Sequence, residues 1–134
     1  MERFSVLLVD DEEDFLRTII KRLTKRGLDA QGVTRGEQAL EVLAQTPKDV
    51  VVLDVKMPGM DGLEVLRKIK DGWPSTEVIM LTGHASIDAA VEGMARGAFD
   101  YLMKPADLED LLYKLEDAYN KKKLHERSQS GNEG

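Results

Sequence analysis

Short runs of apolar residues, uninterrupted by polar positions, constrain the fold of this chain more than any other feature. Val6–Val9, Val50–Leu53 and Val78–Leu81 are each four residues long. Strands that are buried on both faces, as in parallel sheets, have this pattern, whereas strands with one solvated face alternate apolar and polar residues. The segments between the runs repeat apolar residues at helical spacing, as in Phe15–Leu23. Alternating strands and helices predict an α/β fold with a parallel sheet.

Two weaker segments complete a set of five expected strands. Leu28–Val33 is less apolar and is expected at the sheet edge, and Tyr101–Met103 is a short fifth strand. Because crossovers between parallel strands are right-handed, the helices cover both faces, and a doubly wound five-stranded sheet with five helices follows. The five helices are expected around residues 15–23, 39–43, 63–69, 87–94 and 108–119.

Local signals mark where several of these helices begin and end. Thr34 and Glu37 have the spacing of a capping box, and Ser86 and Asp107 are expected N-caps. Gly27 and Gly97 follow the ends of helices. We expect one domain over residues 1–125 and a disordered, polar C-terminal tail over residues 126–134.

Composition excludes several classes of function. The chain of 134 residues has no cysteine, so disulfides and thiolate metal sites are absent and a cytoplasmic location is expected. No apolar run approaches the roughly 20 residues of a membrane span, and no signal peptide is visible. The formal net charge of −6 disfavours direct nucleic-acid binding and is compatible with binding cations. With two histidines, a histidine metal site is not expected.

Polar residues follow four of the five expected strands. Asp10 and Asp11 follow the first strand, and Asp54, Thr82 and Lys104 follow the third, fourth and fifth. Ligand sites of open parallel sheets lie beyond the carboxyl ends of the strands, so these side chains should converge there.

Three converging carboxylates raise one another's pKa values, unless a cation lies among them. Oxygen ligands favour Mg²⁺, with Mn²⁺ as a second candidate. The alternative for Asp10 and Asp11 is that they cap the following helix. Asp54 could be a metal ligand, a general base or a nucleophile that forms an acyl phosphate, and Lys104 could offset the acidic charge and contact a phosphoryl oxygen.

Four motifs together resemble the receiver domain of bacterial response regulators, over about residues 4 to 124. The motifs are VDDE at 9–12, LDVKMPGMDG at 53–62, LTG at 81–83 and GAFDYLMKP at 97–105. The resemblance implies a flavodoxin-like receiver fold with strand order 2-1-3-4-5. It also implies that the Lys104–Pro105 bond is cis.

The resemblance further implies the roles of individual residues. Asp54 is the expected phosphoacceptor, and Asp10, Asp11, Asp54 and the Lys56 backbone carbonyl are the expected Mg²⁺ ligands. Thr82 and Lys104 should hold the phosphoryl oxygens. Thr82 and Tyr101 are the residues expected to move when the domain switches on phosphorylation.

The resemblance identifies a phosphorylation-dependent switch rather than an enzyme. Its expected partner is a sensor histidine kinase or a phosphotransfer protein, and a homodimer through the fourth helix, fifth strand and fifth helix is possible. The charge of Lys56 is expected to tune the lifetime of the phosphorylated state, whereas His84 is interpreted as an ordinary loop histidine. The chain could act alone or as part of a larger regulator.

Two other families use related features. Phosphatases of the haloacid dehalogenase type also have an aspartyl nucleophile, but they resemble Asp-x-Asp at the nucleophile, where this chain has Asp54 and Lys56. A flavodoxin-like cofactor binder needs a phosphate loop after the first strand, where this chain has two acids. Lys121–Lys123 is interpreted as a solvated helix end that favours the helix dipole, or as the start of a linker helix.

Overall fold

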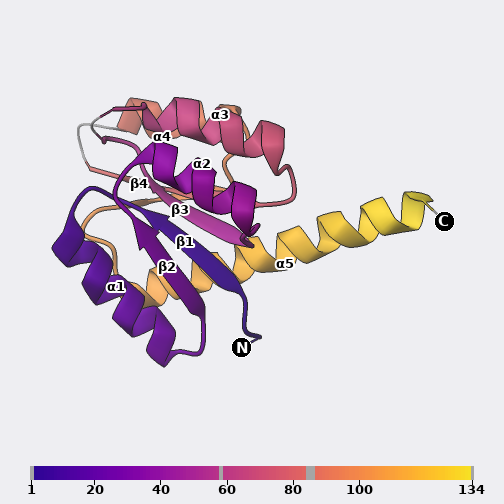
Figure 1. The fold of residues 1–134 in the computed structure, drawn as a ribbon, viewed down its shortest axis with the longest axis horizontal. Helices are drawn as coiled ribbons and strands as arrows, with labels where there is room; N and C mark the ends of the chain where they lie inside the picture. The colour runs from indigo at the N-terminus through magenta and orange to yellow at the C-terminus, as the bar shows by residue number, and fades with distance from the viewer. Residues whose placement is uncertain (1, 58, 84–86, 134) are drawn as a thin grey trace.

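The structure is a computed structural model that describes residues 2–57, 59–83 and 87–133, with side chains as far as Ser128. Strands and helices alternate along the described chain, as predicted (Figure 1). The strands are β1 (Ser5–Val9), β2 (Asp29–Val33), β3 (Val50–Asp54), β4 (Glu77–Thr82) and β5 (Asp100–Met103). The helices are α1 (Glu13–Lys25), α2 (Gly36–Gln45), α3 (Gly62–Gly72), α4 (Ile87–Ala95) and α5 (Leu108–Glu133).

The five strands form one parallel sheet in the order β2-β1-β3-β4-β5, which confirms the predicted order. Register aligns the carboxyl ends of neighbouring strands. Val9 of β1 lies opposite Leu53 of β3, and Asp54 lies opposite Leu81 of β4. The polar residues that follow these positions therefore emerge at one edge of the sheet.

Two apolar layers, one on each face of the sheet, explain the uninterrupted apolar runs. Val6 and Leu8 face the layer that contains side chains of α1 and α5. Leu7 and Val9 face the opposite layer, to which α2 and α3 contribute. Figure 1 shows α1 and α5 on one side of the sheet and α2 and α3 on the other. Each position of the apolar runs in β1, β3 and β4 is thus buried whichever way it points.

The helix ends confirm most of the local signals. Asp107 accepts a hydrogen bond from the Glu109 backbone N–H at 2.7 Å, as an N-cap does. Gly27 and Gly97 have φ values of 89° and 106°, the left-handed backbone that glycine adopts readily after a helix. Ser86 lies outside the described residues.

The capping box of α2 uses a different residue from the one predicted. Gln38, not Glu37, folds back, and its Oε1 accepts hydrogen bonds from the backbone N–H groups of Thr34 and Arg35 at 3.1 and 3.2 Å. The N-cap is Arg35, one residue later than the predicted Thr34, so the reciprocal position shifts by one residue as well.

The last helix is longer than the sequence predicts. The apolar pattern ends near Tyr119, yet α5 continues to Glu133. Helical backbone therefore extends into residues 126–133, while the disorder of that tail stays a prediction. Among the described residues, no helix is long and apolar enough to cross a membrane.

Candidate functional site

Three carboxylates meet at the carboxyl edge of the sheet. Asp10 and Asp11 directly follow β1, and Asp54 is the last residue of the neighbouring strand β3. One carboxylate oxygen of each lies within 4.8 Å of those of the other two. Asp10 and Asp54 are 1% and 7% exposed, whereas Asp11 is open to solvent. The predicted convergence of the three acids is confirmed.

Local backbone hydrogen bonds orient the two buried carboxylates. The Glu12 N–H donates to Asp10 Oδ1 at 2.9 Å, and the Lys56 N–H donates to Asp54 Oδ1 at 3.1 Å. Each is a bond from the second residue after the aspartate, the pattern of an Asx turn. Among the described residues, neither Asp10 nor Asp11 accepts a bond from the first turn of α1, whose N-cap is Glu12. The helix-capping alternative is therefore wrong.

Lys104 brings an ammonium group into this cluster. Its Nζ lies 2.7 Å from Asp10 Oδ2 and 3.6 Å from Asp54 Oδ2, and it also pairs with Glu12 Oε1 at 3.0 Å. The same Nζ lies 4.9 Å from the centre of the Phe15 ring. The bond between Lys104 and Pro105 is cis, as predicted. The lysine is therefore shared among three carboxylates.

The charges of this cluster are not balanced. Burial, and next the charge of Asp10, raise the pKa of Asp54 to about 6, although Lys104 acts in the opposite direction. Burial alone would lower the pKa of Lys104, but its hydrogen bonds to Asp10 and Glu12 outweigh burial and raise it. An oxygen-only donor set with surplus negative charge fits a hard divalent cation such as Mg²⁺.

Thr82 and Tyr101 lie near this edge in a different arrangement. Thr82 is buried at the end of β4, directly after the register partner of Asp54, and its hydroxyl lies 3.5 Å from the Leu102 carbonyl oxygen. Tyr101 is 39% exposed on β5. The switching roles of both residues, and metal binding by the Lys56 carbonyl, stay predictions. Pro58 and His84 lie outside the described residues.

One contact at this site could not be found from the sequence. Glu12 follows the acidic pair inside the motif at 9–12, and no local pattern marks it as a partner of Lys104, yet its carboxylate pairs with that lysine. The two residues are separated by 92 positions.

Beyond Asp54, a shallow hollow of about 440 Å³ is lined by the loop residues Val55, Lys56, Met57, Gly59 and Asp61.

The fold and the acidic cluster define a receiver domain of the kind that response regulators carry. The family model described as "Response regulator receiver domain" matches residues 6–116. The chain belongs to this family. Receiver domains bind Mg²⁺ at an acidic cluster, interact with histidine kinases or phosphotransfer proteins and act as phosphorylation switches. Membership excludes the two other families considered from the sequence.

Curated relatives and solved structures that resemble this chain agree with its membership of the receiver-domain family. The chain is 40% identical to the DNA-binding transcriptional regulator NtrC of Escherichia coli K12 over 118 residues, which are 88% of this chain and 25% of that protein. It is similar to a response regulator receiver domain from Clostridium thermocellum, with 36% identity, a TM-score of 0.86 and coverage of 90% and 98% of the two chains. NtrX from Brucella abortus in complex with ADP has 30% identity and a TM-score of 0.90, over 96% of this chain and 30% of that one. The chain thus spans about a quarter of the length of the curated relatives it matches.

Proposed function

We propose that this chain accepts a phosphoryl group on Asp54 from a phosphohistidine of a sensor kinase or phosphotransfer protein in the cytoplasm. The observation that supports this proposal most is the position of the Asp54 carboxylate, which lies within 4.8 Å of ligand oxygens of Asp10 and Asp11 and 3.6 Å from Lys104 Nζ. A nucleophile, a cation-binding pair and a cationic side chain are thereby assembled at one point.

The transfer follows from this arrangement. An Asp54 carboxylate oxygen attacks phosphorus, the bond from phosphorus to the histidine nitrogen breaks, and its electron pair stays on the imidazole. The product is an acyl phosphate on Asp54, which water later hydrolyses to inorganic phosphate. Asp10, Asp11, Asp54 and the Lys56 carbonyl would hold Mg²⁺, which would neutralise charge on the phosphoryl oxygens. Mn²⁺ could replace it, because it prefers similar ligands.

Lys104 and Thr82 hold the incoming oxygens in this proposal. Lys104 already lies between Asp10 and Asp54, so a small movement of its flexible stem exchanges a carboxylate for a phosphoryl oxygen. The Thr82 hydroxyl has a long contact of 3.5 Å to the Leu102 carbonyl oxygen, which a phosphoryl oxygen can replace. Movement of the Thr82 side chain toward the phosphoryl group would vacate space into which Tyr101 can turn.

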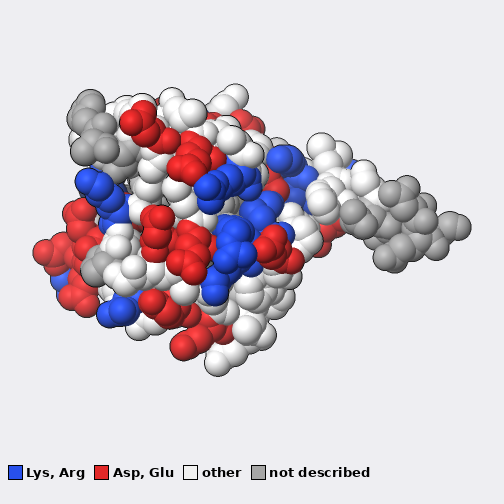
Figure 2. All heavy atoms as spheres, turned by 90° about the horizontal axis from the view of Figure 1, so that it is seen from above, with Lys and Arg blue, Asp and Glu red and all other residues white. Residues whose placement is uncertain are grey.

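The switching surface in this proposal comprises α4, β5 and α5. It exposes apolar side chains that a partner or a second copy of the chain could bury. These are Ile87 (38% exposed), Val91 (64%), Met94 (39%), Tyr101 (39%) and Tyr113 (71%). The added charge of the phosphoryl group would shift Thr82 and thereby change the populations of the conformations that this surface adopts. Figure 2 shows acidic and basic residues side by side on the face that it presents, which favours protein partners over nucleic acid.

Incubation with a small phosphodonor, with and without Mg²⁺, tests the proposal. We expect a mass increase of one phosphoryl group that requires Mg²⁺, is abolished by EDTA and is absent from Asp54→Ala. The control is Asp61→Ala, at an exposed loop carboxylate close to Asp54 in sequence. Phosphate retained on Asp54→Ala would overturn the proposal, as would rapid turnover of the donor without a stoichiometric acyl phosphate.

A further inference from the structure

Three consecutive lysines, Lys121–Lys123, lie inside α5 rather than at its end. The helix continues to Glu133, ten residues beyond Lys123. The macrodipole acts mainly within the last turn of a helix, so it cannot account for the three positive charges here. The interpretation of this segment as a solvated helix end is therefore wrong, and its alternative, the start of a linker helix, stays a prediction.

Each lysine pairs with an acid at, or shortly before, the start of a different strand. The pairs are Lys121 Nζ with Glu77 Oε2 at 3.2 Å, Lys122 Nζ with Asp49 Oδ1 at 2.9 Å and Lys123 Nζ with Glu2 Oε1 at 2.8 Å. We call the three lysines the lysine clamp.

The spatial order of the acids matches the order of the lysines. Glu77 begins β4, Asp49 directly precedes β3, and Glu2 precedes β1. These strands are neighbours in the sheet, in the order β1-β3-β4. Successive residues of a helix point about 100° apart, so three in a row fan out over roughly 200°. The clamp therefore reaches three adjacent strand starts at once, and rotating α5 by a single residue would mismatch all three pairs.

Asp49 and Glu77, the acids that pair with Lys122 and Lys121, are also held by contacts outside the clamp. Asp49 Oδ2 accepts hydrogen bonds from the Ser5 backbone N–H at 2.8 Å and from the Ser5 hydroxyl at 3.1 Å. The Glu77 side chain is 3% exposed and also pairs with Lys70 at 3.2 Å. Lys122 itself is 13% exposed. Such partly buried pairs between fixed groups are screened less by salt than ordinary surface pairs.

Aromatic contacts support the same setting of the helix. The rings of Phe4 and Tyr119 stack with centres 4.5 Å apart. Lys123 Nζ lies 5.0 Å from the centre of the Tyr119 ring, and Lys121 Nζ lies 5.6 Å from that of Phe99. These contacts restrict the last part of α5 that touches the domain. Beyond it, α5 projects away from the body of the molecule (Figure 1).

We propose that the lysine clamp fixes the rotation and the exit direction of α5, so that the helix beyond Leu124 is a rigid projection. The helix begins near Lys104 at the phosphorylation edge and is clamped at the opposite edge of the sheet. In longer proteins like the curated relatives, of which this chain spans about a quarter, such a clamp would hold the following segment in one orientation relative to the receiver domain.

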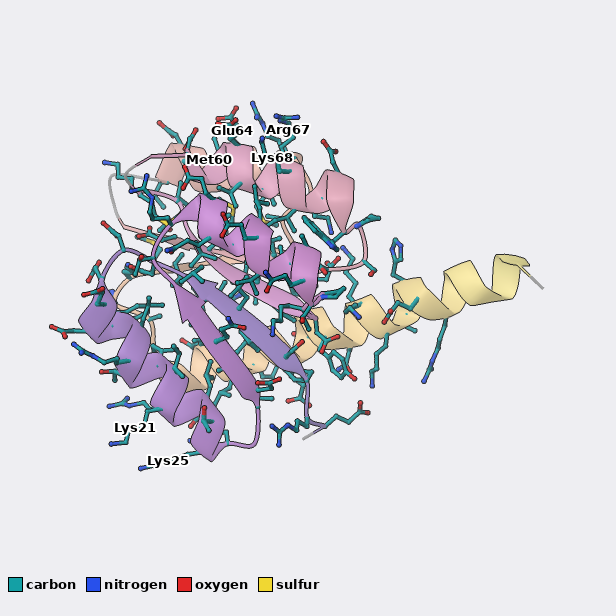
Figure 3. The ribbon with its side chains drawn as sticks, in the orientation of Figure 1. Lys21, Lys25, Met60, Glu64, Arg67 and Lys68 are labelled. Carbon is teal, nitrogen blue, oxygen red and sulfur yellow. The ribbon has the colours of Figure 1, made fainter. Side chains whose placement is uncertain are left out.

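Distances between two spin labels test the clamp directly. The chain has no cysteine, so Gln45→Cys and Arg127→Cys, at exposed positions on α2 and the projecting helix, label selectively. We expect a narrow distance distribution in the parent and one about twofold broader after Lys121→Met, Lys122→Met and Lys123→Met are combined. The control is Lys21→Met on the outward side of α1, where Lys21 has no ion pair among the described residues (Figure 3).

Two further measurements keep the proposal falsifiable. Mg²⁺-dependent phosphorylation of Asp54 should be unchanged in the triple variant, which separates loss of the clamp from loss of the fold. If the triple variant fails to fold, Lys123→Glu should broaden the distribution and adding Glu2→Lys should narrow it again. A distribution as narrow as that of the parent in the folded triple variant, or no rescue by the exchanged pair, would overturn the proposal.

Discussion

The two edges of the sheet carry charges in opposite proportion. At the carboxyl edge four acids lie together, Asp10, Asp11, Glu12 and Asp54, and all but Asp11 pair with one lysine, Lys104. At the amino edge, three acids meet four lysines; they are Glu2, Asp49 and Glu77 with Lys70, Lys121, Lys122 and Lys123. Surplus negative charge characterises the edge with the three converging carboxylates, and paired charges characterise the edge that contacts α5.

The pKa values of an aspartate at each edge are shifted in opposite directions, in line with the charges around them. Burial and Asp10 raise the pKa of Asp54 to about 6, because one lysine does not compensate the cluster. Burial also acts to raise the pKa of Asp49, but hydrogen bonds from Ser5 and the pair with Lys122 outweigh it and lower this pKa. Ionised Asp54 therefore destabilises the folded state without a cation, whereas ionised Asp49 stabilises it.

The largest expected effect is loss of the shared lysine at the carboxyl edge. Lys104→Met leaves Asp10, 1% exposed, without its cation. We expect the free energy of unfolding in Mg²⁺-free buffer to fall by on the order of 3 kcal/mol, as when one partner of a buried pair is removed. Urea unfolding with and without Mg²⁺ measures it, and added Mg²⁺ should restore part of the loss.

Lys122→Met is the matched variant at the amino edge. It also removes a lysine that is mostly buried, 13% exposed against 20% for Lys104. We expect destabilisation that Mg²⁺ does not restore, since no cation-binding group of three acids lies there among the described residues. Equal restoration of both variants by Mg²⁺ would contradict the distinction between the two edges.

The second expected effect is a pair of opposite changes on removing one charge from each edge. The folded-state pKa of Asp54 is raised from 3.8, so its destabilisation develops between about pH 4 and 6 and is complete above that range. Asp54→Asn should therefore raise the free energy of unfolding at pH 7.5 by about 2 kcal/mol without Mg²⁺.

Asp49→Asn should have the opposite sign. The pKa of Asp49 is lowered, so its stabilising contribution is present above its ordinary pKa of 3.8 and is lost as the pH falls through the folded-state value. The variant should be less stable than the parent at pH 7.5, and the difference should shrink at acidic pH. Urea unfolding across pH measures how the free energy of unfolding of each variant differs from that of the parent. Differences of the same sign for both variants at pH 7.5 would contradict the distinction between the two edges.

The sequence predicted the carboxyl edge better than the amino edge for a physical reason. The run Val50–Leu53 sets a buried strand, and Asp54 follows it, so topology alone places that carboxylate at the site. The clamp has no such local signal. Lys123 and Glu2 are 121 positions apart, and Ser5 and Asp49 are 44 apart.

Helix ends show the same limit. Asp107 was predicted correctly because an N-cap acts on its own next residues. The end of α5 was not, because residues beyond Tyr119 lack an apolar stripe, and ion pairs to the sheet accompany the helix where the stripe ends. Long-range charge pairing is what the pattern of one sequence leaves out.

A third expected effect is stabilisation by Mg²⁺ itself. A ligand that binds only the folded state stabilises it by about 1.4 kcal/mol at ten times its dissociation constant. We expect thermal unfolding of the parent to shift upward with Mg²⁺ and that of Asp10→Asn to shift less, because Asp10 contributes one of the three converging carboxylates. An equal shift in Asp49→Asn and the parent is the control, and an equal shift in Asp10→Asn would exclude Asp10 as a ligand.

The smallest expected effect concerns Glu12, the acid that sequence reasoning missed. Its side chain is 64% exposed and pairs with Lys104 at 3.0 Å, whereas Asp10 holds the same ammonium from a position that is 1% exposed. Exposed pairs contribute little, so Glu12→Gln should change the phosphorylation rate of Asp54 by less than roughly threefold. The control is Glu13→Gln, at the next exposed residue.

Glu12→Gln should have two opposing influences on the phosphorylation of Asp54. Removing one of four acids reduces the surplus negative charge, so Glu12→Gln should weaken Mg²⁺ binding slightly while leaving Lys104 freer to reach a phosphoryl oxygen. Rate measurements at saturating Mg²⁺ separate the two influences, because the first then disappears. A tenfold or larger loss under that condition would show that Lys104 needs Glu12 for its position, and the site would have to be extended to a fourth acid.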